Sequence, residues 1–238
     1  MPVVVTGASG LIGPHAVRAF ARSSPQVRAY IRRSEAAEGL RRLGAKVAIG
    51  RIDDVDNLEI VMAGAHTLCH LVGGMNPTGP DGYEESIVGS LEPAIEAARK
   101  AGLRRVLYLS YPGASSEAAN PFVRSKGRAE ELVRSSGLEH VVVRSTLAYG
   151  PGSWWLRVFA KQARRHPAVV VGAGRQVLAP VFVEDVAAVL AAADDRERVN
   201  SGTWGLEGPD RIDADGFADA LASRRARKVH LTPVAAAR

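Results

Sequence analysis

Three glycines at a regular spacing, Gly7, Gly10 and Gly13, are the residues of this chain whose type and spacing most clearly indicate chemistry. They follow a β-branched run, Val3–Val5, which predicts a buried strand, and lead into an apolar-periodic run over 11–22, which predicts a helix. In such a turn the first glycine permits a tight bend, the second lets the backbone approach a pyrophosphate, and the third lets the helix pack closely. The unpaired N–H groups at the helix start then face the phosphates. We therefore expect a dinucleotide to be bound by Gly7, Ser9, Gly10, Leu11, Ile12 and Gly13.

Two arginines indicate which dinucleotide is bound. The predicted second strand, Val27–Ile31, comes about 20 residues after the glycine turn and ends in Arg32 and Arg33 rather than in a carboxylate. A carboxylate there would accept bonds from the ribose 2′-OH of NAD, whereas an arginine accommodates the 2′-phosphate of NADP. We therefore expect NADP(H) as the cofactor. The alternative is that both arginines are ordinary solvated charges after a strand.

The elements that must position these residues alternate between strand and helix patterns. Strands are predicted at Val3–Val5, 27–31, 47–49, 67–72, 106–110 and 141–144, and helices at 11–22, 35–43, 57–62, 84–101 (with Pro93 as a kink) and 123–136. This alternation predicts an α/β fold, a Rossmann-like doubly wound parallel sheet with helices on both faces. Ligands of such a sheet bind at the carboxyl ends of the strands.

Beyond Gly150 the alternation is less regular. We predict helices at 154–165 and 213–223, an alanine-rich helix ending at Ala193, and strands at 169–171, 203–206 and 229–231. Residues 1–150 are thus expected to form the NADP-binding Rossmann domain. Residues 151–238 are expected to form a small C-terminal substrate lobe, interleaved with that domain as one structural unit.

Composition limits the classes of protein that fit. Hydrophobic residues make up 46% of the 238 residues, which suffices for a core. The single cysteine, Cys69, excludes an intrachain disulfide, and with the adjacent His70 it does not form a metal-ligand pattern. The chain has no apolar run of 18 residues and no leader before its first strand, so we expect no membrane association and a cytoplasmic location. The net charge is +6, but the arginines are dispersed and not interleaved with aromatic residues. We therefore expect a small-molecule substrate, no nucleic acid, and a monomer or homodimer.

Six segments match, in order, the motifs of a known family. They are Thr6–Gly13, Val27–Arg32, His70–Gly73, Leu109–Ser110, Arg144 with 149–152, and Pro180–Ala187. Together they resemble the extended and atypical branches of the short-chain dehydrogenase/reductase superfamily: NmrA-like proteins, isoflavone-reductase-like proteins, and those like the NADP-binding subunit of respiratory complex I. The resemblance covers residues 3–210. It implies that Arg32 binds the 2′-phosphate and that Leu71, Val72 and Gly73 lie beside the adenine ribose and nicotinamide.

The catalytic YxxxK motif of that family is altered, since Phe122 stands in place of the tyrosine and Lys126 is retained. In the family the phenol transfers the carbonyl proton, while the lysine lowers its pKa and holds the nicotinamide ribose. Three replacements are open: Lys126 as general acid/base, Tyr111 at the end of the fifth strand, or Tyr149. Ser110 would donate a hydrogen bond to the substrate oxygen. The alternatives are that Lys126 only binds ribose hydroxyls and that Tyr111 only packs under the next loop.

The adenine site and the substrate lobe also carry expectations. Arg51 replaces the family's adenine-contacting aspartate, so the resemblance implies contacts from the backbone near Ile52 and from Asp53, although Asp53 and Asp54 also suit a turn that caps the next helix. In the lobe, we expect the substrate to be contacted by Tyr149, Trp154 and Trp155, with at least one of the two tryptophans in the lobe core.

These expectations favour an NADP(H)-dependent reductase of a small apolar carbonyl, enone or quinone. Two alternatives use the same fold: a non-catalytic NADP(H) sensor or assembly protein, and a non-redox isomerase, dehydratase or cyclase.

Overall fold

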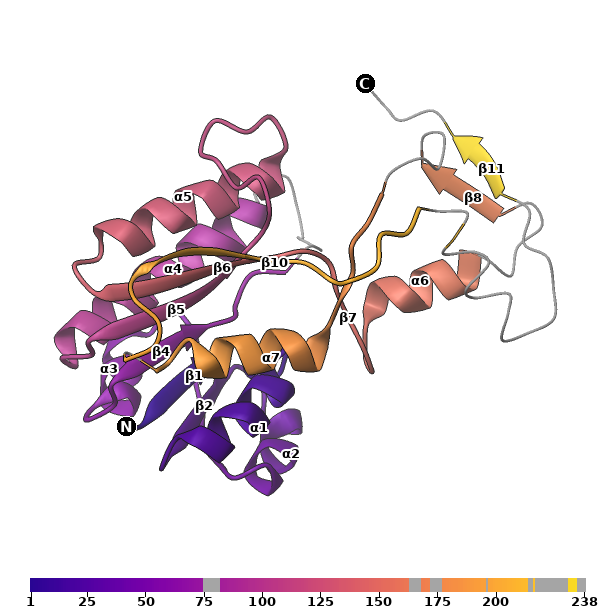
Figure 1. Cartoon of the computed structure of the whole chain (residues 1–238). Coiled ribbons are helices and arrows are strands. Elements are labelled where there is room, and N and C mark those ends of the chain that lie inside the picture. Colours follow the sequence, from indigo (N-terminus) through magenta and orange to yellow (C-terminus); the bar gives the residue numbers. More distant parts are fainter. Residues whose placement is uncertain are drawn as a thin grey trace. The chain divides into compact units, whose positions relative to one another are not determined.

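The computed structural model describes residues 1–74, 82–162, 168–171, 177–195, 197–213, 216 and 231–234 (Figure 1). The chain divides into two compact units. The first comprises Met1–Ser145 and Val183–Leu206, and the second comprises Thr146–Phe182 and Glu207–Arg238.

The first unit is built on a parallel sheet of seven strands in the order β10-β6-β5-β4-β1-β2-β3. Its strands, in chain order, are β1 (Val3–Thr6), β2 (Val27–Ile31), β3 (Ala45–Ile49), β4 (Thr67–His70), β5 (Arg105–Ser110), β6 (Glu139–Ser145) and β10 (Gly202–Leu206). The order reverses between β1 and β4, which creates the switch point where open α/β sheets bind ligands. The predicted Rossmann-like doubly wound sheet is therefore confirmed.

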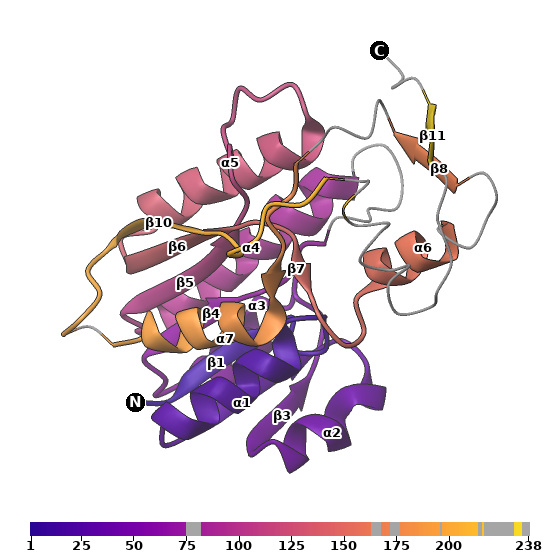
Figure 2. The same cartoon turned by 45° about the vertical axis from the view of Figure 1, so that its right-hand side comes forward.

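Helices cover both faces of this sheet (Figures 1 and 2). They are α1 (Gly13–Ser23), α2 (Ala37–Arg42), which follows the short 3₁₀ turn η1 (Ser34–Ala36), α3 (Val55–Met62), α4 (Gly82–Lys100), α5 (Pro121–Ser135) and α7 (Val183–Ala192). On one face α4 packs between α3 and α5, and on the other α1 packs against α7. The first of these layers buries strand side chains such as Val4, Leu68 and Val106. Successive side chains point to opposite faces, and because helices cover both faces, every residue of β1 and β4 is buried.

Local sequence explains where the site-bearing helix α5 begins. Asn120 precedes it and accepts hydrogen bonds from the backbone N–H groups of Phe122 and Val123, at 3.0 and 3.3 Å. Pro121 occupies the first turn, where its missing N–H costs nothing. Gly137, with a φ of +76°, follows the helix end. The helix therefore begins two residues before the predicted start at Val123.

The second unit contains short elements. β7 (Ala148–Tyr149) pairs with β9 (Val181–Phe182), β8 (Ala168–Val171) pairs with β11 (Leu231–Val234), and α6 spans Trp154–Gln162. The sequence analysis did not predict β7, because two residues carry no periodicity. The predicted helix at 213–223 and residues 229 and 230 lie mostly or wholly outside the described residues. The sequence analysis assigned the helix and strand within 183–206 to the substrate lobe. In the structure they belong to the first unit, which contains the sheet.

None of the described helices combines the length and the apolar character needed to cross a membrane.

Candidate functional site

The glycine turn after β1 is shaped by backbone contacts that exclude side chains. Gly7 has a φ of +70°, and a Cβ added there would lie 2.7 Å from the carbonyl carbon of Leu71 and 2.8 Å from the backbone nitrogen of Val72. A Cβ on Gly13 would lie 2.2 Å from the carbonyl oxygen of Ala8, so the start of α1 packs directly on the turn. The backbone N–H of Gly10 donates to Gly7 at 3.0 Å and closes the turn. Both Gly7 and Gly13 are therefore required by close backbone approach.

The start of α1 fits an anionic group. Its N-cap residue, Ile12, supplies no side-chain hydrogen bond, and the first turn contains no acidic residue. The first N–H groups of a helix have no partner within the helix, and the helix dipole makes this end positive. A pyrophosphate would accept hydrogen bonds from these N–H groups. The start of α1 therefore remains compatible with the expected binding of a pyrophosphate by Ser9, Leu11 and Ile12.

The segment after β4 runs beside this turn. The backbone N–H of Leu71 donates to the carbonyl of Thr6 at 3.1 Å, which extends the β1–β4 pairing by one residue. Gly73 has a φ of +108°, and a Cβ there would lie 2.9 Å from a side-chain carbon of Ile87. The structure thus brings the expected residues Leu71, Val72 and Gly73 to the same sheet edge as the glycine turn.

The expected 2′-phosphate and adenine residues lie at the ends of β2 and β3. Arg32 and Arg33 are exposed directly after β2, and the backbone N–H of Gly50 donates to Ile31 at 3.0 Å, which holds the two strand ends together. Arg51 forms a two-point ion pair with Asp53, with N–O distances of 3.0 and 2.6 Å.

This ion pair engages the carboxylate that the resemblance assigned to the cofactor. Hydrogen bonding to Arg51 lowers the pKa of Asp53, and the same bond raises the pKa of Arg51. Asp54 instead caps α3, because its carboxylate accepts from the backbone N–H of Asn57 at 3.1 Å. Ile52 is partly buried and packs against the core.

A buried polar cluster lies where β5 meets α5. Lys126 is only 5% exposed, and its Nζ donates to the carbonyl oxygen of Leu109 at 2.8 Å. Ser110, the next residue along β5, donates its hydroxyl proton to Oε1 of Glu130 at 2.6 Å. The donation to a substrate oxygen that the sequence analysis expected of Ser110 would therefore require this bond to break.

The electrostatics of Lys126 suit proton transfer. Burial lowers its pKa, the Glu130 carboxylate partly reverses this, and the resulting pKa is about 8. The ammonium also lies 4.9 Å from the centre of the Tyr108 ring, a cation–π distance. Lys126 is therefore charged in most molecules at neutral pH and close to the point where it can give up its proton.

An aromatic cluster of Phe122, Tyr111 and Tyr83 reaches Lys126 through the ring of Phe122. Phe122, at the position of the missing tyrosine, packs edge-on against Tyr111 at 5.3 Å and against Tyr83 at 5.5 Å between ring centres. The Lys126 ammonium is 6.0 Å from the Phe122 ring centre. Tyr111 and Tyr83 are partly exposed, so this aromatic cluster provides apolar surface beside a cation.

His70 and Glu130 are residues whose roles the sequence analysis did not identify. His70 is fully buried, with its two ring nitrogens 2.9 Å from the Thr6 hydroxyl and 3.3 Å from the Ser90 hydroxyl. Burial first, and then the charge of Lys126, lower its pKa to about 3, so His70 stays neutral. The signal for Glu130 was available, because it follows Lys126 by one helical turn on the same face.

The expected substrate residues lie in the second unit. Trp155 is 6% exposed and its indole N–H donates to the carbonyl of Ala148 at 2.8 Å, so it belongs to the core of that unit. Trp154 is exposed, and Tyr149 packs against Phe182 at 5.5 Å.

Comparisons with known proteins agree with this geometry. A family model described as NAD(P)H-binding matches residues 7–197. The ceramide reductase of Caulobacter vibrioides is 30% identical over 190 residues, which are 80% of this chain and 60% of that protein. The mitochondrial NADH dehydrogenase (ubiquinone) 1 alpha subcomplex subunit 9 of Arabidopsis thaliana is 29% identical over 226 residues, 91% of this chain and 56% of that protein. The chain thus spans somewhat more than half the length of these two relatives.

Among solved structures, the triphenylmethane reductase of Citrobacter sp., complexed with NADP(H), superposes with a TM-score of 0.78. Its sequence is 22% identical, and the match covers 98% of this chain and 79% of that one. At this level of identity the likeness concerns the fold. The span matched by the family model includes the glycine turn, both arginines after β2, and the cluster around Lys126.

Proposed function

Because this chain belongs to the NAD(P)H-binding family and its relatives are consistent with an atypical short-chain dehydrogenase/reductase, we propose a function as a reductase. The proposed enzyme uses NADP(H) to reduce a small apolar carbonyl, enone or quinone. One observation carries the proposal: a buried lysine with a pKa of about 8 is held at the end of β5, on the sheet edge that also bears the glycine turn. A buried ionisable group with a perturbed pKa at the ligand-binding edge of a sheet is typical of functional sites.

The preference for NADP(H) rests on charge. Arg32 and Arg33 are exposed at the end of β2, and no described carboxylate forms an ion pair with either. Their guanidinium groups are therefore available to a 2′-phosphate, which an arginine can bind through two parallel hydrogen bonds. The glycine turn and the start of α1 would hold the pyrophosphate.

In the proposed reaction the cofactor, when bound, supplies a hydride, and the chain supplies the proton. Lys126 would donate that proton from Nζ to the substrate oxygen, because one of its three N–H bonds is used by Leu109 and the other two have no hydrogen-bond acceptor among the described residues. Phe122 cannot take this role, since it has no ionisable group. Tyr111 is the second candidate donor, as its phenol follows Ser110 directly.

The apolar character of the proposed substrate rests on the aromatic cluster. The Phe122 ring lies 6.0 Å from the ammonium of Lys126, and Tyr83 and Tyr111 pack edge-on against Phe122, so the cluster presents apolar surface near the lysine. Such surroundings favour an apolar ligand with a single polar atom facing the lysine.

The experiment that tests the proposal has two stages. Calorimetric titration with NADPH and NADH measures cofactor affinity, and nicotinamide absorbance then follows oxidation by a panel of enones, quinones and ketones. Lys126→Ala should abolish oxidation, while Lys100→Ala, which removes an exposed lysine of α4, should leave it unchanged. Tight NADPH binding without oxidation by any compound of the panel would contradict the reductase.

Tight NADPH binding without oxidation would support a non-catalytic NADP(H) sensor or assembly protein. The observation that favours this alternative is Phe122, because the usual proton donor of the family is absent. One relative, the Arabidopsis protein, is by its name a subunit of a larger complex. Such a protein would distinguish NADP⁺ from NADPH by affinity, without turnover.

A further inference from the structure

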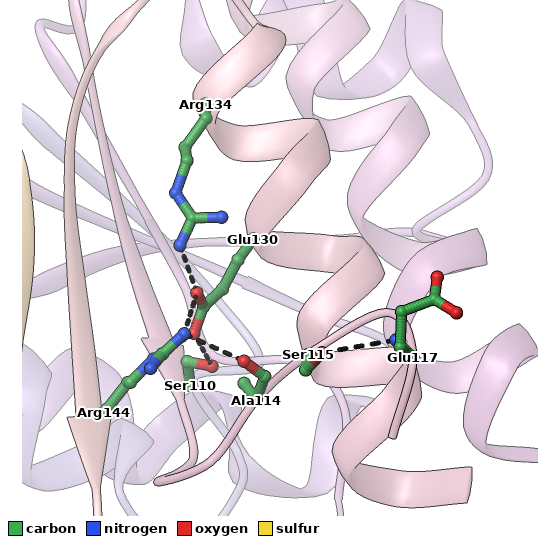
Figure 3. A network of polar contacts seen from close by, with 7 residues as sticks. All are labelled: Ser110, Ala114, Ser115, Glu117, Glu130, Arg134 and Arg144. Atoms are coloured by element: carbon green, nitrogen blue, oxygen red, sulfur yellow. Dashed lines mark hydrogen bonds and ion pairs between the residues drawn. The ribbon is translucent and has the colours of Figure 1, made fainter. Parts of the chain in front are cut away.

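Glu130 is a fully buried carboxylate one helical turn after Lys126 on α5. Both of its oxygens are engaged: Oε1 accepts from Ser110 at 2.6 Å and from Nε of Arg144 at 2.8 Å, and Oε2 accepts from a terminal nitrogen of Arg144 at 2.8 Å (Figure 3). Arg134 bonds to the same Oε2. The fork of Arg144 thus fixes the plane of the carboxylate.

This arrangement determines which way the hydroxyl of Ser110 points. A serine has one proton to donate, and here Glu130 accepts it, so the lone pairs of Ser110 remain for other groups. Ser110 therefore acts as a hydrogen-bond acceptor at the strand end. Lys126, bonded to the adjacent residue Leu109, is a donor only.

The loop after β5 is held by the same network. Arg144 also donates to the carbonyl of Ala114 at 2.9 Å, and Arg124 donates to the carbonyl of Ala118 at 3.0 Å. A Cβ on Gly127 would lie 2.1 Å from the backbone of Ser115, so this loop lies directly on α5. Glu130 and Arg144 therefore hold β5, β6, α5 and this loop in one arrangement around Ser110.

We propose that Glu130 is a positioning residue: it makes Ser110 an acceptor and provides the buried counter-charge of the Lys126 ammonium. The inference deepens the proposed function and rests on it, because it assigns the proton donated to substrate to Lys126 and excludes Ser110 as its source. It predicts a division of roles in which Lys126 contacts the carbonyl oxygen and Ser110 accepts a hydrogen bond from a hydroxyl or N–H group of a ligand.

None of the following ionisable groups supplies a free negative charge to Lys126, which leaves Glu130 as its counter-charge. From β4, His70 is neutral, with a pKa of about 3, and from β5, Tyr108 is buried with a pKa raised well above its usual value. From α4, Glu84 is engaged by Ser125 and Arg128, both at 2.9 Å, and from β6, Arg144 is engaged by Glu130 itself. Burial lowers the pKa of Lys126, and the charge of Glu130 raises it.

The test measures the titration of Lys126 by NMR in the cofactor-free protein, with ¹⁵N-labelled lysine and Lys126→Arg to assign the signal. Glu130→Gln should move the midpoint down by about one pH unit, the lower range for removal of a nearby opposite charge. Glu131→Gln, which removes the exposed charge of the next residue, should not move it. Ser110→Ala should also leave the midpoint in place, because the carboxylate remains.

A second variant guards against misfolding. Arg144→Gln keeps the Glu130 carboxylate but removes one of the two cations paired with it, so the Lys126 midpoint should move up. An unchanged midpoint in both variants overturns the proposal. Because the titration needs no cofactor, it stands apart from the proposed function, which fails instead if NADPH does not bind.

Discussion

Lys126 on α5 donates a hydrogen bond to the carbonyl oxygen of Leu109, the residue before the last in β5, at 2.8 Å. This single contact fixes the distance between the helix and the strand end at the place where an α/β sheet binds its ligands. Together with the Tyr108 ring and the nearby Glu130 carboxylate, this hydrogen bond compensates the burial of the lysine charge.

The first prediction concerns the pH dependence of reduction. With a pKa of about 8, Lys126 is protonated below that value and neutral above it. A step that needs the ammonium should therefore proceed at a constant rate below about pH 8 and fall about tenfold per unit above it. The measurement is kcat/KM for NADPH oxidation across pH. A rate that rises through pH 8 would show that the neutral amine acts as a base instead.

A second prediction compares two glycines. Gly13→Ala places a methyl group 2.2 Å from the carbonyl oxygen of Ala8 and should cost about 1–3 kcal/mol of unfolding free energy, together with most of the cofactor affinity. Gly39→Ala, in α2 with no atom within 4 Å, should instead stabilise by about 0.5–1 kcal/mol. Urea denaturation and NADPH titration of both variants provide the comparison. Equal stability of the two would refute the close approach at Gly13.

The third prediction addresses cofactor choice. Arg32→Ala should weaken NADPH by about 1.5–3 kcal/mol and NADH much less, because it removes a charge-assisted contact to the 2′-phosphate. Arg22→Ala removes an exposed arginine from the last turn of α1 and serves as the charge-matched control. Calorimetry with both nucleotides measures the difference. Equal weakening of NADPH and NADH by Arg32→Ala would mean that another arginine binds the phosphate.

The fourth prediction concerns stability in acid. His70 has a folded-state pKa of about 3, below its ordinary value of 6.5, so between these values the unfolded chain binds a proton that the folded chain does not. The contribution of His70 is therefore complete above pH 6.5 and is lost progressively down to about pH 3, at up to about 1.4 kcal/mol per unit.

The control for this prediction is His70→Gln, which keeps polar atoms near Thr6 and Ser90 but cannot be protonated. Denaturant unfolding at several pH values should show a flatter decline for this variant between pH 6.5 and 4. A decline as steep as that of the parent would assign the acid sensitivity to other groups.

The sequence by itself determined the fold and the glycine turn. Strand and helix differ in the period of their apolar residues, and a glycine required by a turn is visible in the same few residues, so these features are local. The doubly wound parallel arrangement follows because short crossover connections permit few alternatives, whereas the strand order and the place of β10 beside β6 were not predicted. Lys126 was found differently, from its match to the YxxxK motif of the family that the chain resembles.

Only the tertiary structure decided what these residues contact. Glu130 meets Ser110 across 20 residues of sequence and Arg144 across 14, and His70 meets Thr6 across 64. Trp154 and Trp155 are neighbours of the same type, yet one is exposed and the other buried. Which side chains share a buried volume depends on how whole elements pack against one another, and no local pattern of residues encodes that packing.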